Sequence, residues 1–133
     1  MNFKTILIGI VIGAMLSPLL GGIIGLILVL IKGIFDGTSD TSLGEGLFYV
    51  VVTTESSIYL GWLVGLVSAA VSHRHARQGL ALVGGAVGLV VGFLTGIWIL
   101  NFDLSLLILH LLTSIANGAL AANIVGAVAR RTM

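Results

Sequence analysis

The stretch GLALVGGAVGLVVGFLTGIWIL, residues 79–100, contains no charged side chain and is long enough to cross a lipid bilayer as one helix. A helix rises about 1.5 Å per residue, so roughly 20 apolar residues cross a hydrocarbon core about 30 Å thick. Three further stretches with at most one charged residue, 5–31, 47–72 and 104–129, leave only short connectors. The sequence therefore predicts an all-α membrane protein, with four transmembrane helices in a single domain over residues 1–133.

The composition differs strongly from that of a soluble domain. Of the 133 residues, 58% are hydrophobic and only 8% are charged, whereas soluble domains have about 25% charged residues. There is no cysteine, which excludes disulfides, thiolate metal sites and cysteine nucleophiles. The formal net charge of +1 gives no electrostatic support for a nucleic-acid partner. We therefore expect membrane lipids around the chain and no nucleic acid among its partners.

The first apolar stretch lies close to the start of the chain, where a signal peptide would lie. It is longer than the apolar region of a signal peptide, and no small-residue cleavage site follows it, so we interpret residues 5–31 as a retained helix. Pro18 and the pair Gly21 and Gly22 interrupt this stretch. They predict a kink, or a break into two half-helices.

The charged residues of the connectors fall into two groups. Acidic residues follow the first and third stretches, with one lysine among them: Lys32, Asp36, Asp40, Glu45 and Asp103. Basic residues follow the second and fourth stretches and determine the topology, together with Lys4 near the start: Arg74, Arg77, Arg130 and Arg131. Positive charge marks the cytoplasmic side of a membrane. Both termini are therefore predicted to be cytoplasmic, most simply in a cell's inner or plasma membrane.

Local signals refine the ends of these helices. Ser42 followed by Glu45 has the spacing of a capping box, which predicts that the second helix begins within the outer connector. Asp103 is placed to cap the last helix after a turn of a few residues. Aromatic residues near these ends predict a belt at the outer membrane boundary: Phe35, Phe48, Tyr49, Trp98 and Phe102.

Small residues recur at every fourth position in all four stretches. The glycines among them are Gly9, Gly13, Gly21, Gly25, Gly61, Gly65, Gly84, Gly88, Gly92, Gly96, Gly118 and Gly126. Because lipid tails are as apolar as leucine, membrane helices associate through close contact, so small-xxx-small stripes predict packing surfaces. Segment 21–36 also aligns without a gap on 88–103, and 56–74 on 113–131. This similarity predicts two repeated helical hairpins in the same orientation.

Glu55 is a candidate functional residue because it is an acid within an apolar stretch. It lies eight residues after Leu47, which is about 12 Å along a regular helix. An acid at that depth needs a partner, a cavity or a proton. Helical geometry places it on the face of Tyr59 and Trp62, away from Ser57. It is interpreted either as a functional carboxylate or as a structural residue. In the second case the helix starts early, and Glu55 lies near the lipid headgroups or hydrogen-bonds within the neighbouring threonines and serines.

A second polar group in the last stretch follows the i, i+3, i+4, i+7 spacing of one helix face: His110, Thr113, Ser114 and Asn117. Its favoured role is hydrogen bonding between helices, as for Asn123, with proton relay or ligand binding as alternatives. His73 and His75 lie beside arginines in a connector. They are interpreted as a solvated cluster, so neither a metal nor a cofactor is expected.

The sequence contains no catalytic constellation, so we do not expect an enzyme. The leading hypothesis is a structural or accessory membrane subunit that packs within a larger membrane complex, with other subunits, or within an oligomer of its own copies. The alternative is a small proton, ion or solute transporter or channel. In that case Glu55 and the His110, Ser114, Asn117 stripe would line a polar path.

Overall fold

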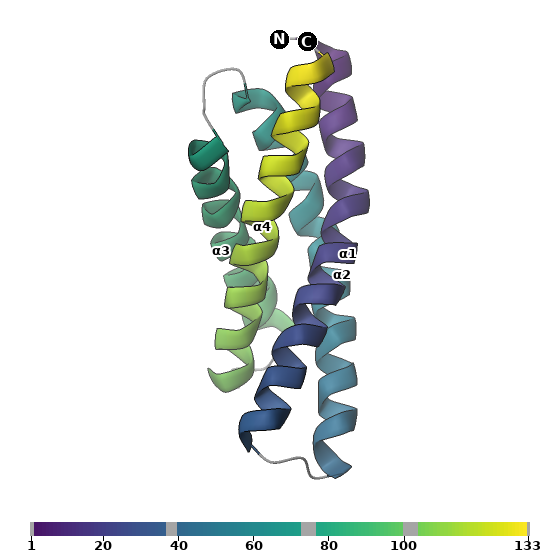
Figure 1. The fold of residues 1–133 in the computed structure, drawn as a ribbon, viewed down its shortest axis with the longest axis vertical. Coiled ribbons are helices and arrows are strands. Elements are labelled where there is room, and N and C mark those ends of the chain that lie inside the picture. The colour runs from purple at the N-terminus through teal and green to yellow at the C-terminus, as the bar shows by residue number, and fades with distance from the viewer. Residues whose placement is uncertain (1, 37–39, 73–76, 100–103, 133) are drawn as a thin grey trace.

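The computed structural model describes residues 2–36, 40–72, 77–99 and 104–132 and contains four long helices in these ranges (Figure 1). They are α1 (Phe3–Asp36), α2 (Asp40–Val71), α3 (Arg77–Ile99) and α4 (Leu104–Thr132). The helices run alternately down and up, so the two ends of the chain lie together at one end of the bundle (Figure 1).

All four helices are long and apolar enough to cross a membrane. The apolar spans are Phe3–Ile31, Leu47–Val71, Gln78–Trp98 and Leu107–Thr132. Each span has at least 21 residues, and about 20 are sufficient. The prediction of an all-helical membrane protein is therefore confirmed at this level.

The first two helices are longer than their apolar stretches, and this corrects two details of the sequence analysis. Helix α1 continues unbroken through Pro18, so the predicted break into half-helices is wrong. Membrane helices tolerate a proline because neighbouring groups and small adjustments satisfy the freed carbonyl. Helix α2 begins at Asp40, before its apolar span, but Ser42 then lies inside the helix and is not its N-cap. The proposed cap at Asp103 lies outside the described residues.

Helices α2 and α4 form the centre of the bundle. Each of them contacts the other three helices, whereas α1 and α3 make no contact with each other within the described ranges. The closest neighbours are α1 with α2, and α3 with α4. Side chains of both α2 and α4 therefore line the interior of the bundle. The polar stripe predicted on α4 lies in this interior.

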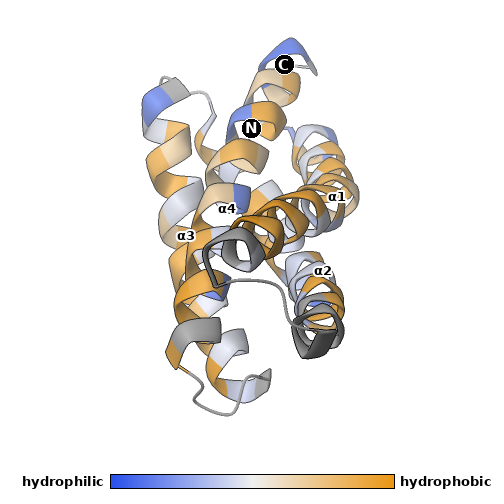
Figure 2. Ribbon diagram, turned by 60° about the horizontal axis from the view of Figure 1, so that its bottom comes forward, coloured by the Kyte–Doolittle hydropathy of each residue, from blue (hydrophilic) through white to orange (hydrophobic). Residues whose placement is uncertain are grey.

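The bundle has its large apolar side chains outside and many of its polar side chains inside. Exposed positions include Met15 on α1 (70%), Leu82 on α3 (76%) and Leu104 on α4 (69%). Hydrophobic residues, in orange, recur along all four helices (Figure 2). A small apolar core, formed by Leu60, Val64, Val91, Ala121 and Ala122, lies between the helices. An apolar exterior of this extent suits lipid rather than water.

Glycines lie where helices approach one another most closely. Each of the twelve glycines named above is buried. A Cβ atom built on Gly13 would overlap the carbonyl oxygen of Gly61, and one on Gly84 would overlap that of Gly118. By contrast, a Cβ on Gly85 would meet nothing nearer than 3.7 Å. At the first two contacts, therefore, a side chain would force two backbones apart.

Candidate functional site

The bundle interior contains a set of polar side chains from all four helices, which we call the inner polar row; all are buried except Thr95 of α3, which is half-buried. Its members are Ser17, Tyr49, Thr53, Ser57, Thr95, His110, Thr113, Ser114 and Asn117. Helix α4 contributes its predicted stripe to this row. His110 and Asn117 are both 0% exposed, and Thr113 and Ser114 are also buried. The structure therefore places all four residues of the predicted stripe in the bundle interior, apart from the other candidate, Glu55.

His110 forms a hydrogen bond from α4 to α3. Its Nε2 lies 2.8 Å from the hydroxyl of Thr95, and that hydroxyl lies 2.7 Å from the carbonyl oxygen of Val91. A carbonyl oxygen only accepts, so Thr95 donates its one proton to Val91 and accepts from His110. Nε2 of His110 is then the donor; in a neutral imidazole with its proton on Nε2, the other nitrogen, Nδ1, has an acceptor lone pair.

Tyr49 and Thr113 repeat this pattern between α2 and α4. The Thr113 hydroxyl donates to the carbonyl oxygen of Leu109, 2.8 Å away, within its own helix. The Tyr49 hydroxyl, 2.9 Å from the Thr113 oxygen, is therefore the donor across the helix interface. Tyr49 is only 1% exposed, so its predicted place in an outer aromatic belt is wrong.

Asn117 joins three helices through a single amide group. Its Nδ2 donates to the backbone oxygen of Ser17 on α1, at 2.9 Å, and to the hydroxyl of Ser57 on α2, at 3.0 Å. The Ser57 hydroxyl in turn donates to the carbonyl oxygen of Thr53. One side chain of α4 therefore satisfies acceptors on both helices of the first hairpin.

Three buried polar atoms of the inner polar row have no hydrogen-bond partner: Nδ1 of His110, Oδ1 of Asn117 and the hydroxyl oxygen of Ser17. The first two are acceptors, and the third also carries a proton to donate. A buried water molecule would satisfy such groups. In the described part of the chain, no member of the row lines the pocket between α3 and α4 or the groove between α2 and α3.

Glu55 lies on the opposite side of α2, outside the bundle. Its side chain is exposed, as are those of Tyr59 (69%) and Trp62 (60%). Within the described part of the chain no hydrogen bond or ion pair involves Glu55. The nearby hydroxyls of Thr54 and Ser56 donate to backbone carbonyl oxygens of α2 instead. The interpretation in which Glu55 bonds within that hydroxyl cluster is therefore wrong, whereas its alternative position near the lipid headgroups stays a prediction.

Of the other residues named from the sequence, some lie where expected, one does not, and several lie outside the described residues. Asn123 donates to Ala119 within α4, rather than to another helix as expected. Phe48 (57%) and Trp98 (89%) are exposed, whereas the side chain of Phe35 and all of Phe102 lie outside the described residues. Arg130 and Arg131 are exposed in the last turn of α4. Arg74 and the side chain of Arg77 lie outside the described residues, as do His73 and His75.

Two features could not be found from the sequence pattern. A pocket near the chain ends lies between α3 and α4, and an apolar groove between α2 and α3 is lined by residues including Leu63, Val67 and Val90. Among the described residues, no three His, Cys, Asp or Glu side chains come together as metal ligands would.

Comparison with known proteins gives no relative: no family model, no curated protein and no solved structure matches this chain.

Proposed function

We propose that this chain is a structural or accessory subunit that packs against another membrane protein through the outer face of α2. We define this docking face by three exposed residues, Glu55, Tyr59 and Trp62. The single observation that carries the proposal is the position of Glu55, which is exposed on the outside of the bundle within the span Leu47–Val71.

A carboxylate in that position is unfavourable in lipid. An acid at the centre of a membrane span is disfavoured by on the order of 3 kcal/mol on insertion scales. Glu55 lies about 12 Å from the nearer end of its span, at 1.5 Å per residue, and thus within the hydrocarbon region. Since its own chain provides no described partner, a hydrogen-bond donor or cation from another molecule would remove this cost.

The distribution of charge favours a different subunit over a second copy. All six lysines and arginines of the chain lie at or beyond the ends of the apolar spans. A second copy in the same orientation would therefore offer no positive side chain at the depth of Glu55. A partner helix with a basic, amide or hydroxyl side chain at that depth would complement it.

Tyr59 and Trp62 supply exposed aromatic surface against which such a partner helix can pack. Tyrosine and tryptophan dominate the binding energy of many protein interfaces because they bury large surfaces with few rotatable bonds. The docking face therefore combines one polar group with two aromatic anchors on adjacent turns of a helix.

The small-residue stripes have a different role in this proposal, which is to hold the bundle itself together. The support is that close contacts recur in both hairpins. Under the alignment of the two hairpins, the contact of Gly21 with Ser57 corresponds to that of Gly88 with Ser114. We therefore also propose that the two hairpins are repeats of one ancestral unit, with small-xxx-small stripes as their packing surfaces.

The charges at the ends of the helices give the proposed orientation. Lys4, Arg130 and Arg131 lie at the end of the bundle that holds both chain ends. Positive residues favour the cytoplasmic side, so we place both termini there, in an inner or plasma membrane.

A second candidate is a small proton or solute carrier, and it rests on the unpartnered atoms of the inner polar row. The support is weaker, because Glu55 points outward from α2 whereas His110 of α4 lies in the bundle interior. No described hydrogen bond joins them. A path through this one chain would use the His110 side without Glu55.

Site-specific crosslinking in native membranes tests the leading proposal. A photoreactive residue at Tyr59 should crosslink to a membrane protein, while one at Leu82, 76% exposed on α3, should crosslink to lipid. Glu55→Leu should remove the crosslink from Tyr59, and Glu55→Gln should retain part of it because the amide still forms hydrogen bonds. Capture of lipid at both positions would refute the proposal. Ion flux in proteoliposomes of the pure chain, lost in His110→Gln and retained in Glu55→Gln, would establish the carrier instead.

A further inference from the structure

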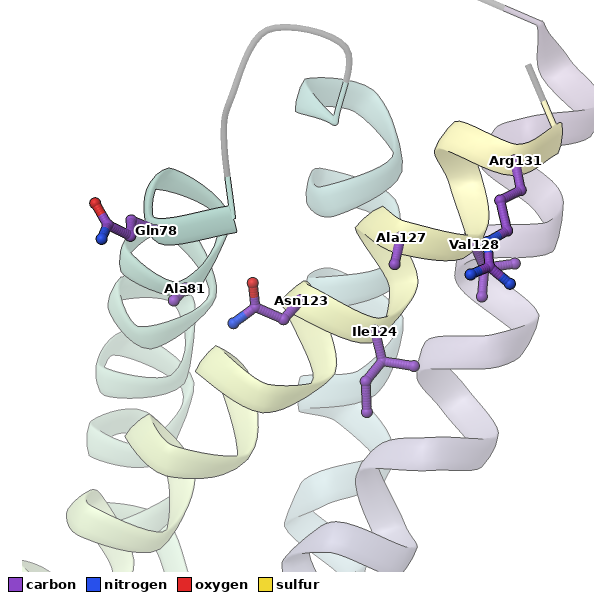
Figure 3. Close-up of a pocket in the computed structure, with 7 residues that line it drawn as sticks. All are labelled: Gln78, Ala81, Asn123, Ile124, Ala127, Val128 and Arg131. Carbon is purple, nitrogen blue, oxygen red and sulfur yellow. The ribbon is translucent and has the colours of Figure 1, made fainter.

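A pocket of about 450 Å³ lies between α3 and α4 near the chain ends (Figure 3). Gln78 and Ala81 line it from α3, and five residues line it from α4: Asn123, Ile124, Ala127, Val128 and Arg131. Figure 3 shows Asn123 beside α3 and Arg131 at the top of α4. The volume falls within the usual range for small-molecule sites, about 300 to 1,000 Å³.

The lining of the pocket changes from polar at its outer end to mainly apolar below. Arg131 and Gln78 are exposed polar residues at its outer end, and neither has a hydrogen bond or ion pair within the described ranges. Below them the lining consists of alanine and aliphatic side chains, with Asn123 as the one polar group. A matching ligand has an anionic, hydrogen-bonding head and an apolar body.

The depth of the pocket in the membrane agrees with this chemistry. Asn123 and Arg131 are eight residues apart on α4, which is about 12 Å along the helix axis. The headgroup layer is about 5 to 8 Å thick on each side of the hydrocarbon core. The pocket therefore extends from the headgroup layer at Arg131 into the upper part of the hydrocarbon at Asn123 and Ile124.

We propose that this pocket binds one anionic phospholipid of the leaflet that faces the chain ends. The phosphate lies at the guanidinium of Arg131, and the glycerol and upper acyl region lie against Ile124, Ala127 and Val128. Basic pockets between transmembrane helices are suited to such headgroups. The site is independent of the docking face on α2, since no residue of that face lines it.

A lipid fits better than a free phosphate because most of the lining is apolar. Arg131 alone offers an anion one exposed cation, and such a contact is weak in water. The apolar walls add affinity only for a ligand with a hydrocarbon body, which is also the ligand that the surrounding bilayer supplies.

Native mass spectrometry of the purified chain tests the proposal, with phosphatidylglycerol and phosphatidylcholine titrated separately at raised ionic strength. Arg131→Gln should weaken phosphatidylglycerol binding about tenfold or more, as for a charge-assisted hydrogen bond. Arg130→Gln is the matched control, because Arg130 is the neighbouring residue and does not line the pocket. It should weaken binding by about fivefold at most, the effect of one basic residue near an anionic surface.

Ala127→Phe provides a test that leaves the charge unchanged. It fills the apolar part of the pocket and should reduce phosphatidylglycerol binding while the helix content, measured by circular dichroism, stays constant. Equal losses in Arg130→Gln and Arg131→Gln would indicate general surface charge and overturn the proposal. Equal affinity for phosphatidylcholine would also overturn it, as would competition by inorganic phosphate at the concentration of the lipid.

Discussion

Gly88→Ala should destabilise the bundle, whereas Gly85→Ala, one turn earlier on the same helix, should not. A Cβ at Gly88 would overlap the backbone oxygen of Ser114 and lie 2.7 Å from its carbonyl carbon and 3.0 Å from the Cα of Ile115. These atoms belong to the backbone of α4 and cannot move aside as a side chain can. A Cβ at Gly85 would meet only Ile115, at 3.7 Å, which is an ordinary contact.

The expected magnitude follows from two opposing effects. Alanine favours a helix over glycine by up to about 1 kcal/mol, and both variants gain this. Overpacking of a close contact costs typically about 1–3 kcal/mol, and only Gly88→Ala incurs it. The two variants should therefore differ by about 1–3 kcal/mol in free energy of unfolding, with Gly85→Ala equal to or more stable than the unmodified chain.

Titration of sodium dodecyl sulfate into the chain in mild detergent measures this difference, with helix content followed by circular dichroism. Leu89→Phe and Val90→Phe serve as bulk controls, since these side chains are exposed (47% and 59%) and face outward. They should leave the unfolding midpoint almost unchanged. Equal midpoints for Gly88→Ala and Gly85→Ala would show that the close approach of α3 and α4 does not stabilise the bundle.

Two further predictions concern the topology and the inner polar row. Cysteines introduced singly at Ser39 and Gln78 should react with a membrane-impermeant reagent from opposite sides, with Ser39 outside; labelling from the same side would refute the four-crossing arrangement. Asn117→Ala should lower the free energy of unfolding by about 1–2 kcal/mol because two interhelical hydrogen bonds are lost. Asn123→Ala should have little effect because that amide bonds only within α4, and equal losses would contradict the role given to Asn117.

The sequence predicts most of the fold because the membrane imposes simple rules. Four apolar stretches of sufficient length determine four helices, and the period of 3.6 residues determines which side of each helix a residue occupies. The burial of the twelve named glycines and the outward position of Glu55 both follow from that period. Neither of these two predictions requires knowledge of how the four helices are arranged.

The pairing of side chains across helices could not be predicted in this way. Tyr49 and Phe48 are neighbours near the same end of α2, yet one is 1% exposed and the other 57%. The helical period explains that difference, since Tyr49 shares its face with the buried Thr53. It does not predict the partner of the Tyr49 hydroxyl, which is Thr113, 64 residues later on α4. Asn117 and Asn123 likewise differ in role only because acceptors of two other helices lie beside the first.

His110 and Glu55 show how a bundle in lipid treats two ionisable side chains differently. The Thr95 hydroxyl accepts a hydrogen bond from His110, and Gly96 leaves space for the imidazole ring, since a Cβ there would lie 3.2 Å from the Cδ2 atom of His110. Glu55 has no such arrangement in the described part of its own chain. A polar group in hydrocarbon must still be satisfied. The Thr95 hydroxyl of α3 provides such a group for His110. Under the proposed function, the corresponding group for Glu55 comes from the membrane protein that docks on α2.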